Sequence, residues 1–216
     1  MKLASHNSWT FLEPIVWWQK PLSFIGKCQK LHIVEQLDAG VEYFDLRVNY
    51  DFKKDCWYIQ HGAFKYAKFE DIKKTLRLLN DWYTWHGTKI YIRVILEQNK
   101  PCIRQEYKEN RFYVLCDYLQ RAYPDIAFTG GCRKFDGRNT HYLFLHNNPE
   151  CEIKEFYSSV TSPSGKNSKK WWSKIDDFWP WLYAKIHNKK HLDENKGSDC
   201  FLMLDFIKKE YKEYAE

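Results

Sequence analysis

The sequence predicts a parallel α/β fold, and three features of the 216-residue chain support this prediction. Short apolar segments rich in β-branched and aromatic residues alternate with longer amphipathic segments. Several of the short segments are apolar throughout, as strands covered on both faces are. The chain is also long enough to bury a sizeable core, close to that of one large domain. A closed barrel and an open doubly wound sheet both fit this alternation.

The expected strands are the short apolar runs. In chain order they cover residues 3–6, 41–48, 56–60, 89–97, 125–130, 141–146, 155–160 and 200–207. The polar segment 162–170 predicts a loop rather than a linker between domains. Because the chain also contains no internal repeat, we expect a single domain over residues 1–216.

The expected helices lie between these strands. Residues 69–85 repeat apolar side chains near one helical face, namely Phe69, Ile72, Leu76, Leu79 and Trp82. Acidic residues in the first turn and Gly87 after the last turn mark the two ends of this helix. Residues 104–123 predict a second helix, stopped by Pro124, and residues 174–188 a third, in which Pro180 marks a start or a kink. Residues 207–216 predict a polar closing helix.

Composition bears on cysteine chemistry, on membrane or signal segments and on the charge of possible partners. The seven cysteines are odd in number and form no C-x-x-C pair, so neither a disulfide framework nor a zinc site is expected. No charged-then-apolar leader opens the chain and no apolar run approaches ~18 residues, so we expect a soluble chain without signal peptide or membrane span. The formal net charge of +6 favours anionic partners, including phosphate esters and phospholipid surfaces.

Charged and histidine side chains stand at the ends of the expected strands. They are His6, Asp45, Arg47, His61, Glu97, Arg133 and Asp205. In a parallel barrel the carboxyl ends of the strands share one rim, where active sites lie. Two imidazoles and a guanidinium on one rim have the parts for phosphoryl transfer: a base, an acid and a group that neutralises charge on phosphorus.

Each of these residues also has a plain structural explanation. His6 and His61 could be turn residues, and Asp45 with Arg47 could be an ordinary, partly buried ion pair. Asp205 is harder to explain in this way, because a carboxylate inside an apolar strand is costly without a partner.

Three segments in the first third of the chain resemble the X domain of phosphatidylinositol-specific phospholipase C. They are SHNS at 5–8, QLDAGVEYFDLRV at 36–48 and the His-Gly pair at 61–62. Further along, VILEQN at 94–99 and LMLDFI at 202–207 are similar to the fourth and last strands of that family. The strong match covers residues 3–62, and the match over residues 100–198 is weak.

The resemblance implies an irregular (β/α)8 TIM-type barrel that cleaves the glycerol–phosphate bond of phosphatidylinositol. It implies that His6 is the general base on the inositol 2-hydroxyl and that Asp205 orients His6. Arg47, helped by Asp45, would stabilise the pentacoordinate phosphorus. His61 would be the general acid, and the first product would be inositol 1,2-cyclic phosphate.

The resemblance leaves the metal requirement open. Asn7, Asp45 and Glu97 stand where the eukaryotic branch of the family binds calcium, whereas Arg47 matches the bacterial branch, in which a guanidinium does the work of the metal. Three oxygen ligands beside an arginine make a poor site for Ca²⁺, which takes 6–8 oxygens. We therefore expect no cofactor, with Ca²⁺ as the alternative.

Substrate and membrane contacts are predicted from the remaining motifs. Arg133, at a strand end, is a candidate contact to inositol or phosphate together with Glu97, and Tyr157 is a candidate to stack on a sugar-like ring or to pack in the core. The tryptophans of PIVWWQKP and KNSKKWWSK, Trp17, Trp18, Trp171 and Trp172, are candidate contacts to a membrane surface. The first pair could instead pack in the barrel's shell. We expect a monomer with no nucleic-acid partner, although the second motif could also stack on single strands.

Two other functions remain open at this stage. One is a metal-dependent enzyme of the glycerophosphodiester phosphodiesterase type on a related barrel. The other is a catalytically inactive barrel that only binds phosphoinositide or membrane. The presence of both histidines favours an enzyme.

Overall fold

The structure is a computed structural model that describes residues 1–97, 105–132, 145–158 and 179–215. These residues divide into two compact units. The first unit comprises Met1–Phe44 and Glu150–Glu216, and the second comprises Asp45–Pro149. The strand β2 (Val41–Asp51) supplies residues to both.

The first unit is built on parallel strands. These are β1 (Lys2–Ser5), β8 (Glu152–Phe156), β9 (Cys200–Leu204) and the first residues of β2. Their order is β2-β1-β9-β8, and each pair is parallel. Every residue of β9 is buried, as the continuous apolar run in the sequence predicts.

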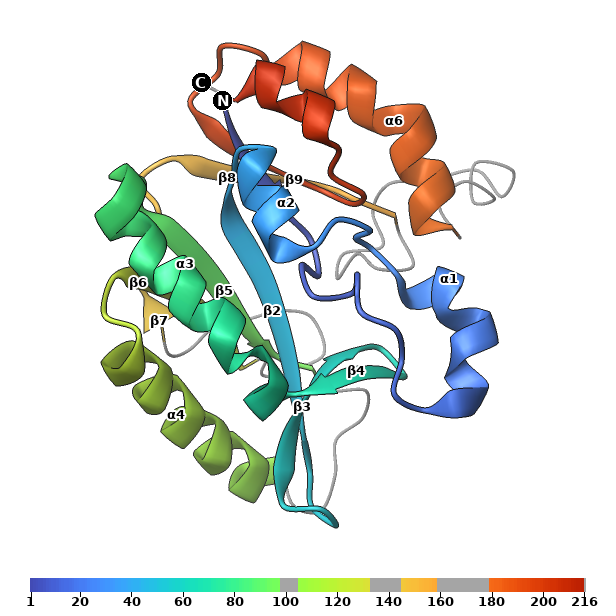
Figure 1. The fold of residues 1–216 in the computed structure, drawn as a ribbon, viewed down its shortest axis with the longest axis vertical. Helices are drawn as coiled ribbons and strands as arrows, with labels where there is room; N and C mark the ends of the chain where they lie inside the picture. Colours follow the sequence, from blue (N-terminus) through green and yellow to red (C-terminus); the bar gives the residue numbers. More distant parts are fainter. Residues whose placement is uncertain (98–104, 133–144, 159–178, 216) are drawn as a thin grey trace. The chain divides into compact units, whose positions relative to one another are not determined.

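Figure 1 shows the helices of the first unit, of which α6 packs on β9. They are the 3-10 helix η1 (Trp17–Leu22), α1 (Ser23–Gly26), α2 (Ile33–Asp38), α6 (Pro180–Asn195) and the 3-10 helix η4 (Lys209–Tyr214). α2 begins with a capping box in which His32 accepts from the backbone while the side chain of Glu35 accepts in return. α6 begins at Pro180, because proline at the first helical position loses no intrahelical hydrogen bond.

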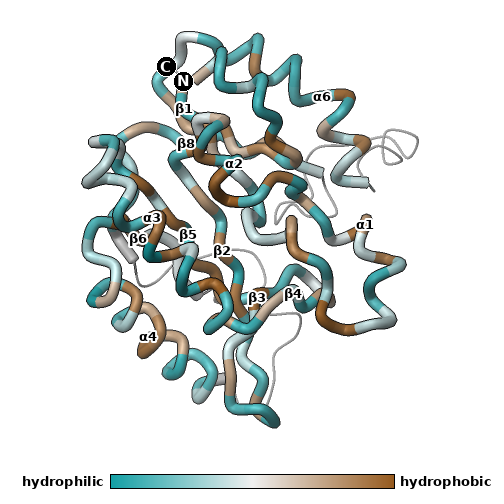
Figure 2. The backbone as a smooth tube through the Cα atoms, viewed as in Figure 1, coloured by the Kyte–Doolittle hydropathy of each residue, from teal (hydrophilic) through white to brown (hydrophobic). Residues whose placement is uncertain are grey.

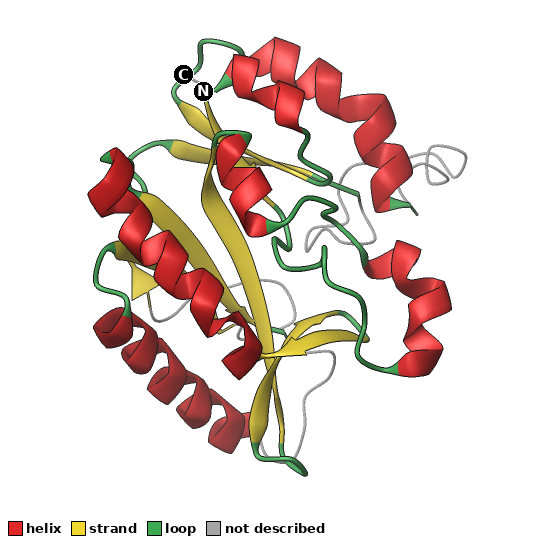
Figure 3. Cartoon of the chain, viewed as in Figure 1, coloured by secondary structure: helices red, strands yellow, loops and turns green. Residues whose placement is uncertain are grey.

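The second unit combines parallel and antiparallel strands (Figure 3). They are the rest of β2, β3 (Cys56–His61), β4 (Phe64–Lys68), β5 (Ile90–Leu96), β6 (Ile126–Cys132) and β7 (Leu145–His146). β5 pairs in parallel with β6 over all seven residues. β2, β3 and β4 form two successive antiparallel hairpins.

Two helices accompany these strands: α3 (Lys73–His86), preceded by the 3-10 turn η2 (Phe69–Ile72), packs on β5, and α4 (Gln105–Ala122) packs on β6 (Figure 1). α3 ends at Gly87, whose φ of 69° is in the left-handed region that glycine adopts without steric cost. The core residues of β5 are hydrophobic while α6 is mostly hydrophilic, as the colours of Figure 2 show.

Most expected elements are present, with five corrections. β4 was not expected, and β3 is antiparallel to β2 rather than a parallel barrel strand. The strand expected at 155–160 lies at Glu152–Phe156, and the polar segment at the chain's end is a short 3-10 helix, Lys209–Tyr214. Pro180 starts a helix that runs to Asn195, beyond the expected end at 188.

The mixed α/β class is confirmed, but a closed eight-stranded barrel is not shown. In the described residues β7 pairs only with β6, and β8 pairs only with β9. The expectation of one domain stays a prediction. No helix among the described residues is both long enough and apolar enough to cross a membrane.

Candidate active site

His6 lies in the turn that follows β1, among buried polar side chains of the first unit. The backbone N–H of His6 donates to the carbonyl of Leu204 at 3.1 Å, which continues the pairing of β1 with β9. Asn7 follows with a φ of 46°, in the left-handed region that asparagine tolerates better than most residues. The carbonyl of Asn7 then accepts from both the backbone and the hydroxyl of Thr10. The sequence His-Asn thus ends the strand in a tight turn.

His6 and Asp205 form a buried pair from opposite ends of the chain. Nδ1 of His6 lies 2.7 Å from Oδ1 of Asp205, and both side chains are fully buried. Oδ2 of Asp205 accepts from the backbone N–H of Ser158 at 3.3 Å. Nε2 of His6 lies 3.0 Å from the amide nitrogen of Asn7, which can only donate to it. These contacts favour the tautomer with the proton on Nδ1, and Nε2 is then the basic nitrogen.

Tyr157 packs flat on the imidazole of His6. Their ring centroids are 3.7 Å apart and the planes differ by 2°. The hydroxyl of Tyr157 donates to Glu155 at 2.6 Å. Tyr157 therefore packs against the imidazole of His6, and its stacking on a substrate ring stays a prediction.

Amide side chains fix the backbone on both sides of the pair. Nε2 of Gln29 donates to the carbonyls of His6 and Leu204, and its Oε1 accepts from the N–H of Ile207. The side chain of Asn188 on α6 donates to the carbonyl of Asp205 at 2.7 Å. Because buried amides are costly when unpaired, this network holds β1 and β9 in one register at the site.

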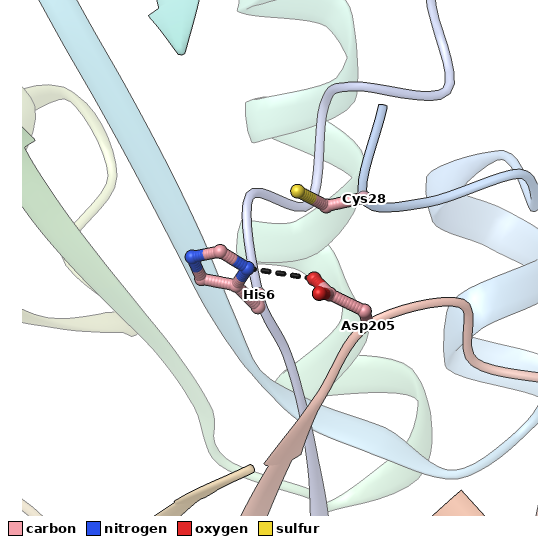
Figure 4. A group of neighbouring side chains, drawn as sticks. All are labelled: His6, Cys28 and Asp205. Atoms are coloured by element: carbon pink, nitrogen blue, oxygen red, sulfur yellow. Dashed lines mark hydrogen bonds and ion pairs between the residues drawn. The ribbon is translucent and has the colours of Figure 1, made fainter. Parts of the chain in front are cut away.

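Cys28 completes a buried group with His6 and Asp205 (Figure 4). One potential ligand atom from each lies within 4.8 Å of the others. However, 2.7 Å between Nδ1 and Oδ1 is the length of a direct hydrogen bond. Ligand atoms about 2.0–2.2 Å from a tetrahedral metal would be further apart than this. The distance is therefore that of a direct hydrogen bond between His6 and Asp205, and the expectation of no metal cofactor stays a prediction.

In the second unit, Asp45 on β2 lies between two arginines. Its Oδ2 accepts from Nε of Arg47 at 3.0 Å, and its Oδ1 accepts from Nε of Arg93 at 2.9 Å. Asp45 and Arg47 are two residues apart on one strand and so share a face, while Arg93 comes from β5. All three side chains are at least 92% buried. Both oxygens of the Asp45 carboxylate are thus engaged by buried guanidinium groups.

Glu97 joins this cluster to the turn that carries His61. Its Oε2 lies 3.7 Å from Nη1 of Arg47, and its Oε1 accepts from the N–H of Gly62 at 2.8 Å. His61 is the last residue of β3, and β3 runs back along β2 from Asp51 toward Val48. The hairpin therefore returns His61 toward the part of β2 that carries Arg47. His61 itself is 7% exposed.

The second unit thus groups Asp45, Arg47 and Glu97 and links them to the turn that carries His61. The first unit groups His6 with Asp205 and Tyr157. Arg133 lies outside the described residues, as do Trp171 and Trp172.

Sequence reasoning missed Arg93 and Gln29. Arg93 had a signal: it is a charge inside the apolar run 89–97 and shares a strand face with Glu97, four residues on. Gln29 stands in a polar stretch and had no such signal.

No protein-family model and no curated protein matches the chain. Solved structures do. The phosphatidylinositol-specific phospholipase C from Listeria monocytogenes matches with a TM-score of 0.58 and 16% identity, over 99% of this chain and 91% of that one. The chain has the fold of a bacterial phosphatidylinositol-specific phospholipase C.

Structures of the Staphylococcus aureus phosphatidylinositol-specific phospholipase C are similar as well. A double mutant of that enzyme matches with a TM-score of 0.57 and 12% identity, over 99% of this chain and 91% of that one. Another, concerned with the modulation of its membrane binding, matches at 0.55 and 12%, over 99% and 92%. At these identities the likeness to phospholipase C shows the fold alone.

The surface of the first unit exposes aromatic residues around η1. Trp17 is 80% exposed and Trp18 is 53% exposed, and Phe24 of α1 contacts Trp179 edge to face. The alternative that both tryptophans of η1 pack inside is therefore wrong.

Proposed function

We propose that the chain is a phosphodiesterase and phosphorus–oxygen lyase that acts on phosphatidylinositol-type phosphodiesters. The observation that carries the proposal is the buried His6–Asp205 pair, with Nε2 as the basic nitrogen, in a chain with the phospholipase C fold. A neutral imidazole backed by a carboxylate is the arrangement of a general base. We also propose that the full chain forms the irregular barrel of this fold.

The proposed reaction is an internal displacement at phosphorus. Nε2 of His6 takes the proton of the inositol 2-hydroxyl, whose oxygen forms a new bond to phosphorus. The bond from phosphorus to the glycerol oxygen breaks, and His61 gives that oxygen a proton. The products are diacylglycerol and inositol 1,2-cyclic phosphate. No water is consumed in this step.

Arg47 is proposed to stabilise the charge that develops on the phosphate oxygens. Asp45 orients Arg47 through Nε, and it shares its other oxygen with Arg93. A guanidinium held in this way matches phosphate geometry and needs no reorganisation during the reaction. Glu97 and Arg133 remain proposed substrate contacts, and Tyr157 is proposed to act by holding His6.

We propose that the reaction needs no metal ion. The alternative calcium ligands are Asn7, Asp45 and Glu97, but each carboxylate oxygen of Asp45 already accepts from an arginine. Oε1 of Glu97 accepts from a backbone N–H. A donor set so engaged does not fit Ca²⁺, which takes 6–8 oxygens. Turnover should persist in a strong chelator, whereas an enzyme of the glycerophosphodiesterase type would lose it.

The exposed tryptophans suggest how a lipid substrate is reached. We propose that η1, through Trp17 and Trp18, lies at headgroup depth in a membrane surface. Tryptophan favours this depth because its ring is apolar and its indole N–H is polar.

The acid–base assignment is tested by His6→Ala and His61→Ala, assayed as release of water-soluble inositol phosphate from phosphatidylinositol. Each substitution should lower kcat by about 10²–10⁴-fold, the range for a general acid or base. His86→Ala, at the exposed end of α3, is the matched control and should keep full activity. If both site variants turn over at the original rate, the assignment is wrong. If the original chain binds phosphatidylinositol vesicles but releases no product, the chain is an inactive binding barrel.

A further inference from the structure

A concave site lies in the first unit, and His6 is not among its lining residues. It is a pocket of about 510 Å³ bounded by the segment after β9, by the start of α6 and by the two residues before His32. This volume is within the ordinary range of small-molecule sites. None of its lining residues has a role in the proposed reaction.

The wall of the pocket is apolar. Leu31, Ala184, Phe206 and Ile207 form it together with the ring of Trp181. Trp181 is 52% exposed, although tryptophan side chains are highly buried on average. An apolar wall with a half-exposed indole suits a hydrocarbon chain.

The rim of the pocket carries four lysines and one glutamate. Two of the lysines are neutralised: Lys208 lies 3.4 Å from Glu210, and Lys209 lies 2.9 Å from Glu35. Lys30 and Lys185 have no carboxylate within ion-pair distance among the described residues. Lys185 instead lies over the ring of Trp181, 5.2 Å from its centre. The rim therefore offers two cations to a ligand that brings its own negative charge.

We propose that this pocket binds a single-chain anionic amphiphile, a molecule with a carboxylate or phosphate head and one hydrocarbon chain. The head pairs with Lys30 and Lys185, and the chain lies against Trp181, Phe206 and Ile207. Charge and apolar area are both required. A free inorganic anion lacks the chain, and a cationic amphiphile is repelled by the rim.

Phe206 connects the pocket to the residue that orients His6. It directly follows Asp205, and its own N–H donates to the carbonyl of Cys28 at 2.6 Å. The next residue, Ile207, donates its backbone N–H to Oε1 of Gln29. An occupant of the pocket would therefore touch the turn that directly follows Asp205.

The test is a calorimetric titration of the full chain with dodecanoate below its micelle concentration. One-site binding should appear, with quenching of tryptophan fluorescence. Inorganic phosphate and dodecyltrimethylammonium should not bind at the same concentration. Lys30→Glu combined with Lys185→Glu should weaken dodecanoate binding by about tenfold or more, because two attractions become repulsions.

A matched control separates a site from general charge attraction. Lys53→Glu combined with Lys54→Glu changes the net charge equally on exposed residues of the β2–β3 turn. This control should bind dodecanoate as the original chain does. Equal loss in both double variants, or equal binding of the cationic amphiphile, overturns the proposal. The milder double variant, Lys30→Ala with Lys185→Ala, should also weaken dodecanoate binding, by a smaller factor. All of these measurements report binding and need no catalytic turnover.

Discussion

At the scale of single residues, the pair of His6 and Asp205 carries the proposed chemistry. We assign Asp205 a positioning role, because its carboxylate contacts Nδ1 of His6, the ring nitrogen opposite the proposed basic Nε2, and accepts from the N–H of Ser158. Its carboxylate selects the tautomer and stabilises the imidazolium that forms when His6 takes a proton.

Replacing Asp205 by asparagine keeps the shape of the side chain and removes its charge. We expect kcat to fall by about 10²–10⁴-fold with little change in KM, since the amide cannot stabilise an imidazolium. The acidic limb of the pH–rate profile should also move to lower pH. Asp193→Asn, on the exposed face of α6, is the control. A loss of kcat with an unmoved profile would mean that Asp205 has only a structural role.

His191 on α6 makes stability depend on pH. Burial, followed by the neighbouring His187, lowers the pKa of His191, whose ring stacks on Phe156 at 4.1 Å. In the unfolded chain this imidazole binds a proton below about pH 6.5, so the unfolded state takes up more protons than the folded state. The stability contributed by neutral His191 is therefore present above this pH and lost below it.

The loss of stability at low pH leads to a prediction for the variant His191→Phe. Between about pH 7.5 and about pH 5.5, the free energy of unfolding should fall less in this variant than in the original chain. Urea titrations at the two pH values measure the difference. An equal or larger fall in the variant would show that His191 does not contribute.

Single residues differ in how far the sequence reveals them. His6, Asp45 and Arg47 stand in a motif that resembles a known family, and Asp205 is a charge inside an apolar strand. Gln29 could not be found in this way, because its role depends on three backbone groups from distant segments.

At the scale of elements, the turn after β9 shapes both the site and the lysine-rimmed pocket. Phe206 has a φ of 49°, a left-handed conformation that is a genuine outlier for a bulky residue. Such a residue persists only where its surroundings hold it. Here the N–H of Phe206 donates to the carbonyl of Cys28, and the N–H of the next residue, Ile207, donates to Oε1 of Gln29.

The left-handed backbone conformation at Phe206 can be tested by comparing two substitutions that shorten its side chain. Phe206→Ala and Phe206→Gly both lose the ring, but only glycine relieves the backbone. We expect the glycine variant to have a free energy of unfolding about 1 kcal/mol above that of the alanine variant. Denaturant titration of the two proteins checks this, and a more stable alanine variant would contradict the assigned conformation.

The short helix η1 is the element proposed to reach the membrane. Trp17→Ala combined with Trp18→Ala should weaken binding to phosphatidylinositol-containing vesicles by about tenfold or more, because two exposed rings lose their apolar area. Trp85→Ala is the control, since Trp85 on α3 is 63% exposed. Vesicle sedimentation measures both. Equal binding of the double variant and the original chain would exclude η1 as the contact.

Element prediction succeeded where one physical signal dominated. The amphipathic period and the caps gave α3, and continuous apolar runs gave β5 and β9. β4 was missed because FKYAK alternates weakly and follows a tight turn at Gly62. The direction of β3 was also missed, since an apolar run of five residues does not state whether it pairs in parallel or antiparallel fashion.

At the scale of the whole molecule, the proposed mechanism draws on both units. His6 and Asp205, proposed as the base and its carboxylate, belong to the first unit, whereas Arg47 and His61 belong to the second. β2 joins the two, since it runs from Val41 to Asp51 and carries Asp45 and Arg47. Sequence pattern alone predicted the α/β class but could not choose between a closed barrel and an open sheet, because strand alternation is the same in both.

Phosphorus NMR of the products of phosphatidylinositol cleavage tests the central claim most directly. Attack by the inositol 2-hydroxyl predicts that a cyclic phosphodiester signal appears first and that it appears without added metal. An acyclic phosphomonoester as the first product, or turnover only after a divalent cation is supplied, would contradict an internal displacement assisted by two histidines and an arginine.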